Sequence, residues 1–378
     1  MNTRITSLSA ALSLVLASGA FAQNTPPTIR PFDVMPNQWR VGLAGNDGTP
    51  IWGDALANMV TPIAQNGTKI AFAFGQCYGG GMLTNLSTIN AGPNGVAINI
   101  SATSASSWHQ TAWYPAPING VSVRPGLTGA NTPNDHSYDW VDSYVDHFGG
   151  NVTASAAADL AWTFDPFGTN VGPVNAAGRV DRGPVERVRA REIAQYFNVG
   201  TGGTLTHNVQ TNKQAILYSG KPNAADADQM SQAWASLRAD GYAAANIHVL
   251  FGAGWDPLNP NAIVNMLPLA ARNQAIEATE NNLANTIANI GAIANLDQLF
   301  FLSNDHGTAR NNAWPANRWV ETPKPGDGPS SGSQLPYDLE GYTPGTDPTL
   351  YFGSYYVPSP GALSLGGLGL LMITRRRR

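Results

Sequence analysis

Two uninterrupted apolar runs constrain the fold of this chain more than any other feature. Residues 69–77 read KIAFAFGQC and residues 297–307 read DQLFFLSNDHG, and the apolar part of neither run alternates with polar side chains. A strand with one face in water alternates, whereas a central strand of a parallel sheet is buried on both faces and is apolar throughout. The two runs therefore predict central strands of a parallel sheet.

The rest of the chain predicts further strands and helices in alternation. Such an order favours right-handed crossovers and a parallel sheet, so we expect an α/β fold: an open, mostly parallel sheet with helices on both faces. Further strands are expected over 39–45, 96–101, 213–220 and 246–252. Helices are expected over 52–67, 137–148, 184–197, 224–241 and 278–296, with a weak one over 261–273 that Pro268 interrupts. Residues 115–136, 200–212 and 308–356 are typical of loops, and 149–184 show no clear period.

The first residues have the pattern of an export signal. Arg4 precedes a short apolar run, and Ala20-Phe21-Ala22 has the small-x-small spacing of a cleavage site. We expect a signal peptide over 1–22. The alternative is a first core helix, which the Pro-rich QNTPPTIRP segment that follows would break.

The last residues, 357–378, read VPSPGALSLGGLGLLMITRRRR. The apolar part is shorter than the roughly 20 residues that span a bilayer, and the arginines favour a cytoplasmic end. The segment resembles the PEP-CTERM sorting signal of Gram-negative bacteria, although Ser359 stands where that motif often has Glu. The resemblance implies transient membrane association, removal by an exosortase-type enzyme, and a location at the cell surface or outside the cell. The alternative is a plain tail anchor.

Composition narrows the class of partner. Charged residues make up 12% of the chain, and no basic patch is interleaved with aromatic residues, so the sequence predicts no nucleic-acid partner. Removal of both end segments would take away Arg4 and the terminal arginines and leave a more acidic protein. That charge favours solubility and does not identify a partner.

Cys77 is the only cysteine of a chain that we expect to be exported. Exported proteins usually pair their cysteines, and a single one cannot form a disulfide within its own chain. Three interpretations remain: an inert buried thiol, a reactive nucleophile, or a disulfide between two molecules.

The two apolar runs both end in reactive residues, Cys77 and His306. Ligand and catalytic sites of parallel sheets form beyond the carboxyl ends of the strands. If the two strands are neighbours, the thiol and the imidazole meet at one edge. A thiol needs a base or a cationic neighbour to act as a nucleophile near neutral pH, and backbone N–H groups flanked by glycine can stabilise an oxyanion.

The sequence around these residues resembles the legumain type of caspase-like cysteine peptidase. SNDHG is similar to the Ser-Asp-His-Gly step of that family, and FGQCYGGGM to its Cys-x-Gly/Ser-Gly block. In that family the His block precedes the Cys block, whereas Cys77 comes first here. The resemblance therefore implies a circular permutation, with the ancestral ends joined near 200–212 and new ends after His306.

The resemblance also implies a domain organisation. A caspase-like α/β domain would span 23–356, with a Cys-bearing part over about 40–150 and a His-bearing part over about 213–310. A variable region over about 150–212 would separate them, and a loop-rich tail over 311–356 would follow. The implied function is that of an exported cysteine endopeptidase that acts on a protein or peptide through a thioester acyl-enzyme, with no cofactor.

Transferred position by position, the resemblance makes Cys77 the nucleophile and His306 the general acid and base. The N–H groups of Gly307 and Cys77 would form the oxyanion hole, and Asp305 would orient the site. The substrate pocket would be lined by Ser101, Trp108, His109 and Asn223. Its charges depart from the legumain pattern, so the sequence predicts no preferred residue at the cleavage site.

The remaining histidines show no metal spacing, and His248 within an apolar run is typical of a satisfied core residue. Two alternatives stay open. The protein could be a catalytically inactive caspase-like surface or matrix protein, or Cys77 could join two molecules by a disulfide.

Overall fold

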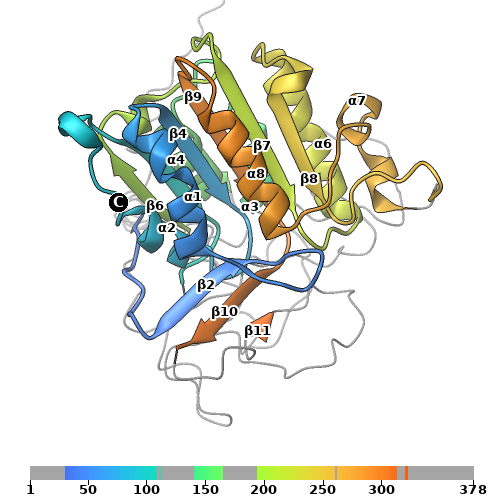
Figure 1. Cartoon of the computed structure of the whole chain (residues 1–378), viewed down its shortest axis with the longest axis horizontal. Helices are drawn as coiled ribbons and strands as arrows, with labels where there is room; N and C mark the ends of the chain where they lie inside the picture. Colours follow the sequence, from blue (N-terminus) through green and yellow to red (C-terminus); the bar gives the residue numbers. More distant parts are fainter. Residues whose placement is uncertain are drawn as a thin grey trace, which may run out of the picture.

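A central sheet dominates the computed structural model, which describes residues 30–108, 112, 140–164, 194–259, 262–312 and 320–321. Seven strands form this large sheet in the order β1-β6-β5-β4-β9-β7-β8 (Figure 1). Strands β5, β4, β9, β7 and β8 are mutually parallel, and β6 is antiparallel to β5. The strands are β1 (Arg30–Pro31), β4 (Lys69–Phe74), β5 (Asn99–Ser104), β6 (Gln195–Val199), β7 (Lys213–Ser219), β8 (Ile247–Phe251) and β9 (Gln298–Ser303).

Helices cover both faces of the large sheet. In Figure 1, α1 and α8 lie in front of the sheet, and their apolar side chains pack with Ile70, Phe72 and Phe301. The opposite core contains side chains of α3, α4 and α6. The helices are α1 (Gly53–Gln65), α2 (Gly80–Leu86), α3 (Trp140–His147), α4 (Ala154–Phe164), α6 (Ala224–Ala239), α7 (Leu269–Arg272) and α8 (Glu280–Gly291).

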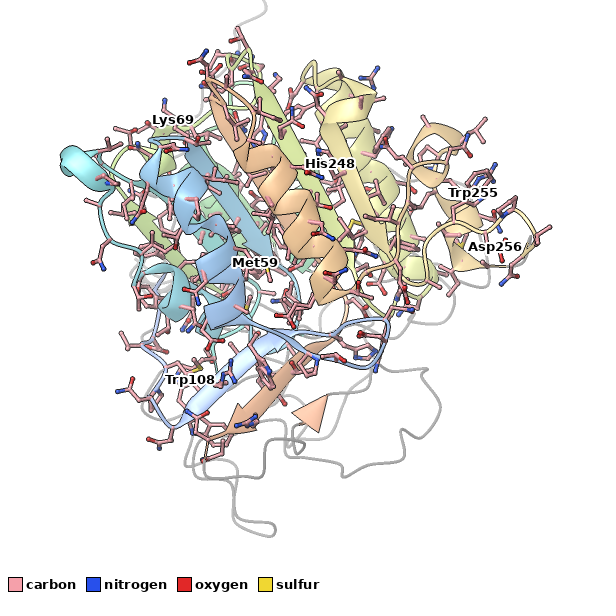
Figure 2. The ribbon with its side chains drawn as sticks, in the orientation of Figure 1. Met59, Lys69, Trp108, His248, Trp255 and Asp256 are labelled. Atoms are coloured by element: carbon pink, nitrogen blue, oxygen red, sulfur yellow. The ribbon has the colours of Figure 1, made fainter. Side chains whose placement is uncertain are left out.

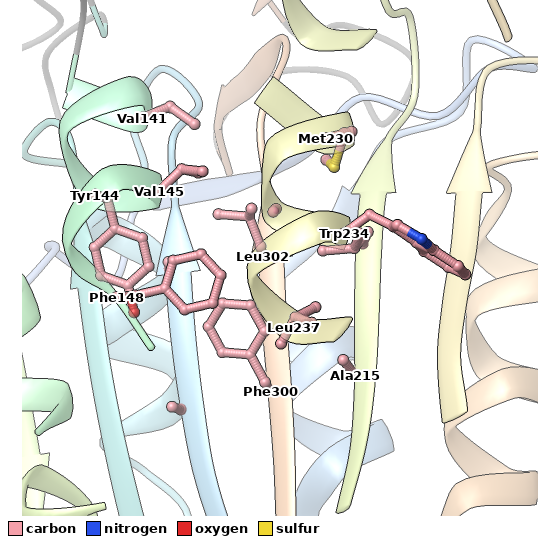
Figure 3. Close-up of a cluster of buried hydrophobic side chains, with 14 of the residues drawn as sticks. Val141, Tyr144, Val145, Phe148, Ala215, Met230, Trp234, Leu237, Phe300 and Leu302 are labelled. Carbon is pink, nitrogen blue, oxygen red and sulfur yellow. The ribbon is translucent and has the colours of Figure 1, made fainter. Parts of the chain in front are cut away.

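The apolar runs are buried on both faces, as the sequence predicts. Alternate residues of β9 point to opposite cores: Phe301 joins the core of α1 and α8, and Phe300 and Leu302 join that of α3 and α6. Figure 3 shows Phe300 and Leu302 facing α3 and α6, and the Phe300 ring stacks on Phe148 at 5.0 Å. Burying one such side chain contributes about 1.5–3 kcal/mol, so β9 and its neighbours fix the centre of the fold.

A second, four-stranded sheet has the order β11-β10-β2-β3. Strand β10 begins four residues after the end of β9, so this small sheet adjoins the carboxyl end of β9 (Figure 1). The side chains of Val41, Leu43 and Ala309 bury one of its faces in the core of α1 and α8. The strands are β2 (Trp39–Leu43), β3 (Ile51–Trp52), β10 (Gly307–Asn311) and β11 (Val320–Glu321).

Several boundaries correct the expectations from sequence. The loop expected over 308–356 is wrong at its start, because residues 307–311 pair with β2 as β10. The helix expected over 184–197 is wrong at its end, because Gln195–Val199 pairs with β5 as β6. The strand expected over 96–101 lies at Asn99–Ser104, in the register that pairing with β4 sets. Helix α4 occupies part of the region with no clear period, since buried alanines pack it against α3.

The two expected sorting segments, 1–22 and 357–378, lie outside the described residues, as does the expected loop over 115–136. Within the described ranges, no helix is both long and apolar enough to cross a membrane.

Candidate functional site

The strands that carry Cys77 and His306 are neighbours. Strand β4 pairs with β9 in parallel, and Phe74 lies opposite Ser303. Cys77 follows Phe74 by three residues and His306 follows Ser303 by three, so both leave the sheet at the same level. Paired strands lie about 4.8 Å apart. The fold therefore brings together the two residues that are 229 positions apart in the sequence.

Backbone contact between the two strand ends is direct. A Cβ atom added to Gly307 would lie 1.8 Å from the carbonyl oxygen of Cys77. Only a residue without a side chain fits at that distance, so the glycine after His306 is what allows the two segments to touch. This contact joins the start of β10 to the turn that follows β4.

The Gly307 N–H points away from β2. Gly307 lies opposite Leu43 in the antiparallel ladder, and the Ala44 N–H donates to the His306 carbonyl oxygen at 3.2 Å. These two facts make Leu43 and Gly307 a non-hydrogen-bonded pair, in which neither N–H is directed at the partner strand. An oxyanion donor needs an N–H group that the neighbouring strand does not use, and β2 does not use the N–H of Gly307.

Both reactive side chains are buried. Cys77 is 8% exposed and His306 is 6% exposed. The Cys77 thiol donates to the carbonyl oxygen of Ala112 at 3.7 Å, and His306 Nε2 lies 3.7 Å from Asp305 Oδ1. The second distance is too long for a strong hydrogen bond, but it places a carboxylate beside the imidazole.

Asp305 is fixed by the loop after β7. The backbone N–H of Lys221 donates to Asp305 Oδ2. Asp305 has φ 99°, and Tyr78, the residue after Cys77, has φ 62°. Non-glycine residues rarely adopt such angles, and strained residues of this kind gather at functional sites at a cost of about 1–3 kcal/mol each.

Gln76, which the sequence analysis did not single out, links the two strand ends. Ser303 Oγ donates to Gln76 Oε1 at 2.6 Å. The Gly79 N–H and the Ser106 hydroxyl donate to the Gln76 carbonyl oxygen at 3.3 Å each. No composition or spacing signal marks this pair, because it forms only when β4 and β9 are side by side.

Polar atoms collect at the same edge of the sheet. Several buried side-chain atoms there have no hydrogen-bond partner among the described residues. Each unpaired buried polar group costs about 1–3 kcal/mol. The concentration of these groups at the ends of β4, β5, β7 and β9 and at the start of β10 indicates a place for polar ligand atoms or water. They are Gln76 Nε2, Ser107 Oγ, Ser219 Oγ, Asn304 Oδ1 and Thr308 Oγ1.

The residues expected to line a substrate pocket are not all brought to this edge. Ser101 lies in the interior of β5, three residues before the strand ends, and its hydroxyl bonds to Tyr196 at 3.2 Å. Trp108 is buried and lies 6.1 Å from the ring of Trp39. Figure 2 shows Trp108 beside β2, at the opposite end of the molecule from Lys69. Lys69 is the first residue of β4, so Trp108 lies on the side of the sheet where β4 ends. His109 lies outside the described residues.

Asn223 has a structural task. It is the N-cap of α6, and its side chain accepts hydrogen bonds from the N–H groups of Ala225 and Asp226. The Asp226 carboxylate in turn accepts from the Asn223 N–H and completes a capping box. Asn223 is on the loop that follows β7, but its side-chain oxygen is already used.

His207 and His248 lie away from this edge. His248 on β8 bonds to Gln214 Oε1 at 3.0 Å, so its expected hydrogen bonding is confirmed, but it is half-buried and does not belong to the core. His207 lies in a buried cluster with Tyr242 and Gln298. In the part of the chain that the structure describes, no group of His, Cys, Asp and Glu side chains is arranged to hold a metal ion.

Comparison with protein-family models, with curated proteins and with solved structures finds no match.

Proposed function

We propose that the protein is a cysteine peptidase whose nucleophile is Cys77 and whose general acid and base is His306. One observation carries the proposal: adjacent parallel strands deliver a thiol and an imidazole to the same level of one sheet edge. The direct backbone contact between Gly307 and Cys77 supports it.

The reaction that these groups could perform is acyl transfer. His306 accepts the thiol proton while Cys77 Sγ attacks the carbonyl carbon of a peptide bond, with the oxyanion facing the Gly307 and Cys77 N–H groups. The C–S bond forms, the C–N bond breaks, and the imidazolium gives its proton to the leaving amine. Water then attacks the thioester, the C–S bond breaks, and the products are a carboxylic acid and the free thiol.

The strand order supports the further proposal that the domain is caspase-like and circularly permuted. When strands are counted from β7 through β8 and β9 and then on to β4, β5 and β6, their order across the sheet is 2-1-3-4-5-6. The first five follow a common order of doubly wound sheets, in which ligands bind where the order reverses. In this count the strand at that reversal is β9, and His306 follows its last residue by three positions.

A second candidate function is a catalytically inactive caspase-like surface or matrix protein. The burial of both side chains favours it, as does the hydrogen bond from the thiol to the Ala112 carbonyl oxygen. An inert thiol would have these features.

Peptide hydrolysis tests the two candidates. The purified protein should cleave members of a peptide library without added metal. Cys77→Ala should abolish cleavage, and His306→Ala should lower it by about 10²-fold or more. His248→Ala is the matched control: it removes a half-buried imidazole and one hydrogen bond far from Cys77 and should retain activity. Figure 2 shows His248 on β8. Full activity of the Cys77 variant would exclude the peptidase proposal.

A further inference from the structure

The hydrogen bond between the side chains of Gln76 and Ser303 joins the end of β4 to the end of β9. Gln76 is the residue before Cys77, and Ser303 is the last residue of the strand that leads to His306. Both side chains are buried, Gln76 at 1% and Ser303 at 0% exposed. A hydrogen bond of 2.6 Å in such surroundings holds its partners firmly.

From this arrangement we infer that Gln76 and Ser303 are positioning residues that set the distance between the Cys77 sulfur and the His306 imidazole. The inference rests on the proposed function. A reactive pair must be held within about 0.5 Å of its productive geometry by neighbours that are themselves fixed. The Gln76 side chain reaches from the end of β4 to Ser303 on β9. Because Gln76 precedes Cys77 in the chain, the orientation of the Gln76 side chain is coupled to that of the Cys77 backbone.

Backbone contacts on each side of the pair make the coupling rigid. The Gly75 N–H donates to the Ser303 carbonyl oxygen at 2.7 Å, which extends the β4–β9 ladder by one residue. The Gln76 carbonyl oxygen accepts from Gly79 and Ser106. Gln76 is thus held from β9 through its side chain, and through its main chain from the turn after β4 and the segment after β5.

The chain offers a closely matched control. Ser104 and Ser303 lie opposite Phe74 on its two sides, one on β5 and one on β9. Both serines are fully buried, and Ser104 Oγ donates one hydrogen bond, to the Ser106 carbonyl oxygen at 2.9 Å. Ser104→Ala and Ser303→Ala therefore remove the same group at the same level of the sheet, but only Ser303→Ala removes a partner of the Gln76 side chain.

The test measures the rate of Cys77 alkylation by iodoacetamide from pH 5 to pH 10. The wild-type protein should reach half its maximal rate well below the value of about 8.5 typical of a free cysteine. Ser303→Ala, Gln76→Met and the double variant should each slow alkylation at pH 7 by about tenfold and move the half-maximal pH upward. The double variant should be no slower than either single one, because the two residues act through one bond.

Thermal unfolding separates positioning from stability. Ser104→Ala should lower the unfolding midpoint about as much as Ser303→Ala and leave the alkylation profile unchanged. A wild-type thiol that reacts quickly, combined with Ser303→Ala and Gln76→Met variants that react equally quickly, would overturn the inference and leave the peptidase proposal standing. A wild-type thiol no faster than a free cysteine would overturn both.

Discussion

Strain gathers on the residues next to the reactive pair. Tyr78 follows Cys77 and Asp305 precedes His306, and both have positive φ. The only other non-glycine residue of the described ranges with positive φ is Asn295, a residue type that tolerates it. A tyrosine in this conformation is uncommon, so the turn after β4 is held by its surroundings and not by its local preference. The conformations of Tyr78 and Asp305 lower the stability of the folded protein, and strained residues of this kind are typical of functional sites.

Gly307 gives a prediction at the scale of one residue. Gly307→Ala would place a Cβ 1.8 Å from the Cys77 carbonyl oxygen and force the two strand ends apart. We expect a loss of about 3 kcal/mol in the free energy of unfolding, together with loss of peptide cleavage. Urea unfolding and a cleavage assay measure the two effects.

Gly48→Ala is the control for this substitution. Gly48 has positive φ, at 80°, which Gly307 does not, and a Cβ there meets no atom within 4 Å. Gly48→Ala should therefore cost about 1 kcal/mol through backbone strain alone and retain activity. A Gly307→Ala protein as active as Gly48→Ala would show that close contact between the strand ends is not required.

At the scale of elements, helix α6 begins at the same sheet edge as the site. Asn223→Ala should lower the free energy of unfolding by about 1 kcal/mol through loss of the N-cap and should leave KM for peptides unchanged. Asn223→Ser keeps a capping side chain and should restore the stability. Thr279→Ala, which removes the N-cap of α8, is the comparison for stability. A rise in KM for Asn223→Ala without loss of stability would indicate that Asn223 contacts the substrate and would contradict a purely structural role.

The aromatic cluster between α3 and β9 predicts sensitivity to acid. His207 is buried between Phe148 and Phe300. Burial, with a smaller contribution from the nearby Lys213 charge, lowers its pKa to about 3. The unfolded chain takes up a proton near pH 6.5, and the folded one only near pH 3, so stability falls as the pH falls through that window.

The loss from His207 should be about 3 kcal/mol between pH 7 and pH 4. Urea unfolding at the two pH values measures it, and a His207→Asn variant, which cannot take up this proton, should lose correspondingly less. Equal losses in the two proteins would contradict the assignment.

The sequence predicts most of the large sheet, and the errors have a common cause. KIAFAF and QLFFLS show their burial in their own composition, so β4 and β9 are found without the structure. Strand β10, which reads GTARN, has no such signal and exists because β2, more than 260 positions earlier in the chain, pairs with it. Strand β6 has local sequence compatible with a helix, and pairing with β5 decides its conformation.

The candidate site also has residues that local sequence reveals and residues that only the pairing of strands reveals. Cys77 and His306 stand at the ends of two recognisable strands, so their meeting could be predicted from the rule for parallel sheets. Gln76 and Ser303 could not be predicted, because neither residue has a role until the register between β4 and β9 is known. Asn223 looked like a pocket residue until the capping box showed where its oxygen is bound.

At the scale of the whole molecule, the proposed permutation predicts that the order of the segments can be changed. Residues 200–212 connect β6 to β7, and Val209 is 61% exposed. A chain that begins at Gln210 and ends at Val209, with the ends of residues 30–321 joined by a flexible linker, should fold with a similar circular dichroism spectrum and unfold cooperatively. Failure to fold with several linker lengths would contradict the permutation.

The most direct measurement of the central claim is whether the reactivity of Cys77 depends on His306. Iodoacetamide should alkylate native wild-type protein at pH 7 at least about tenfold faster than the same protein unfolded in urea. His306→Ala should bring the native rate down to the unfolded one or below, and His248→Ala should leave it unchanged. A native rate that His306→Ala does not alter would contradict the claim that the two strand ends form one reactive pair.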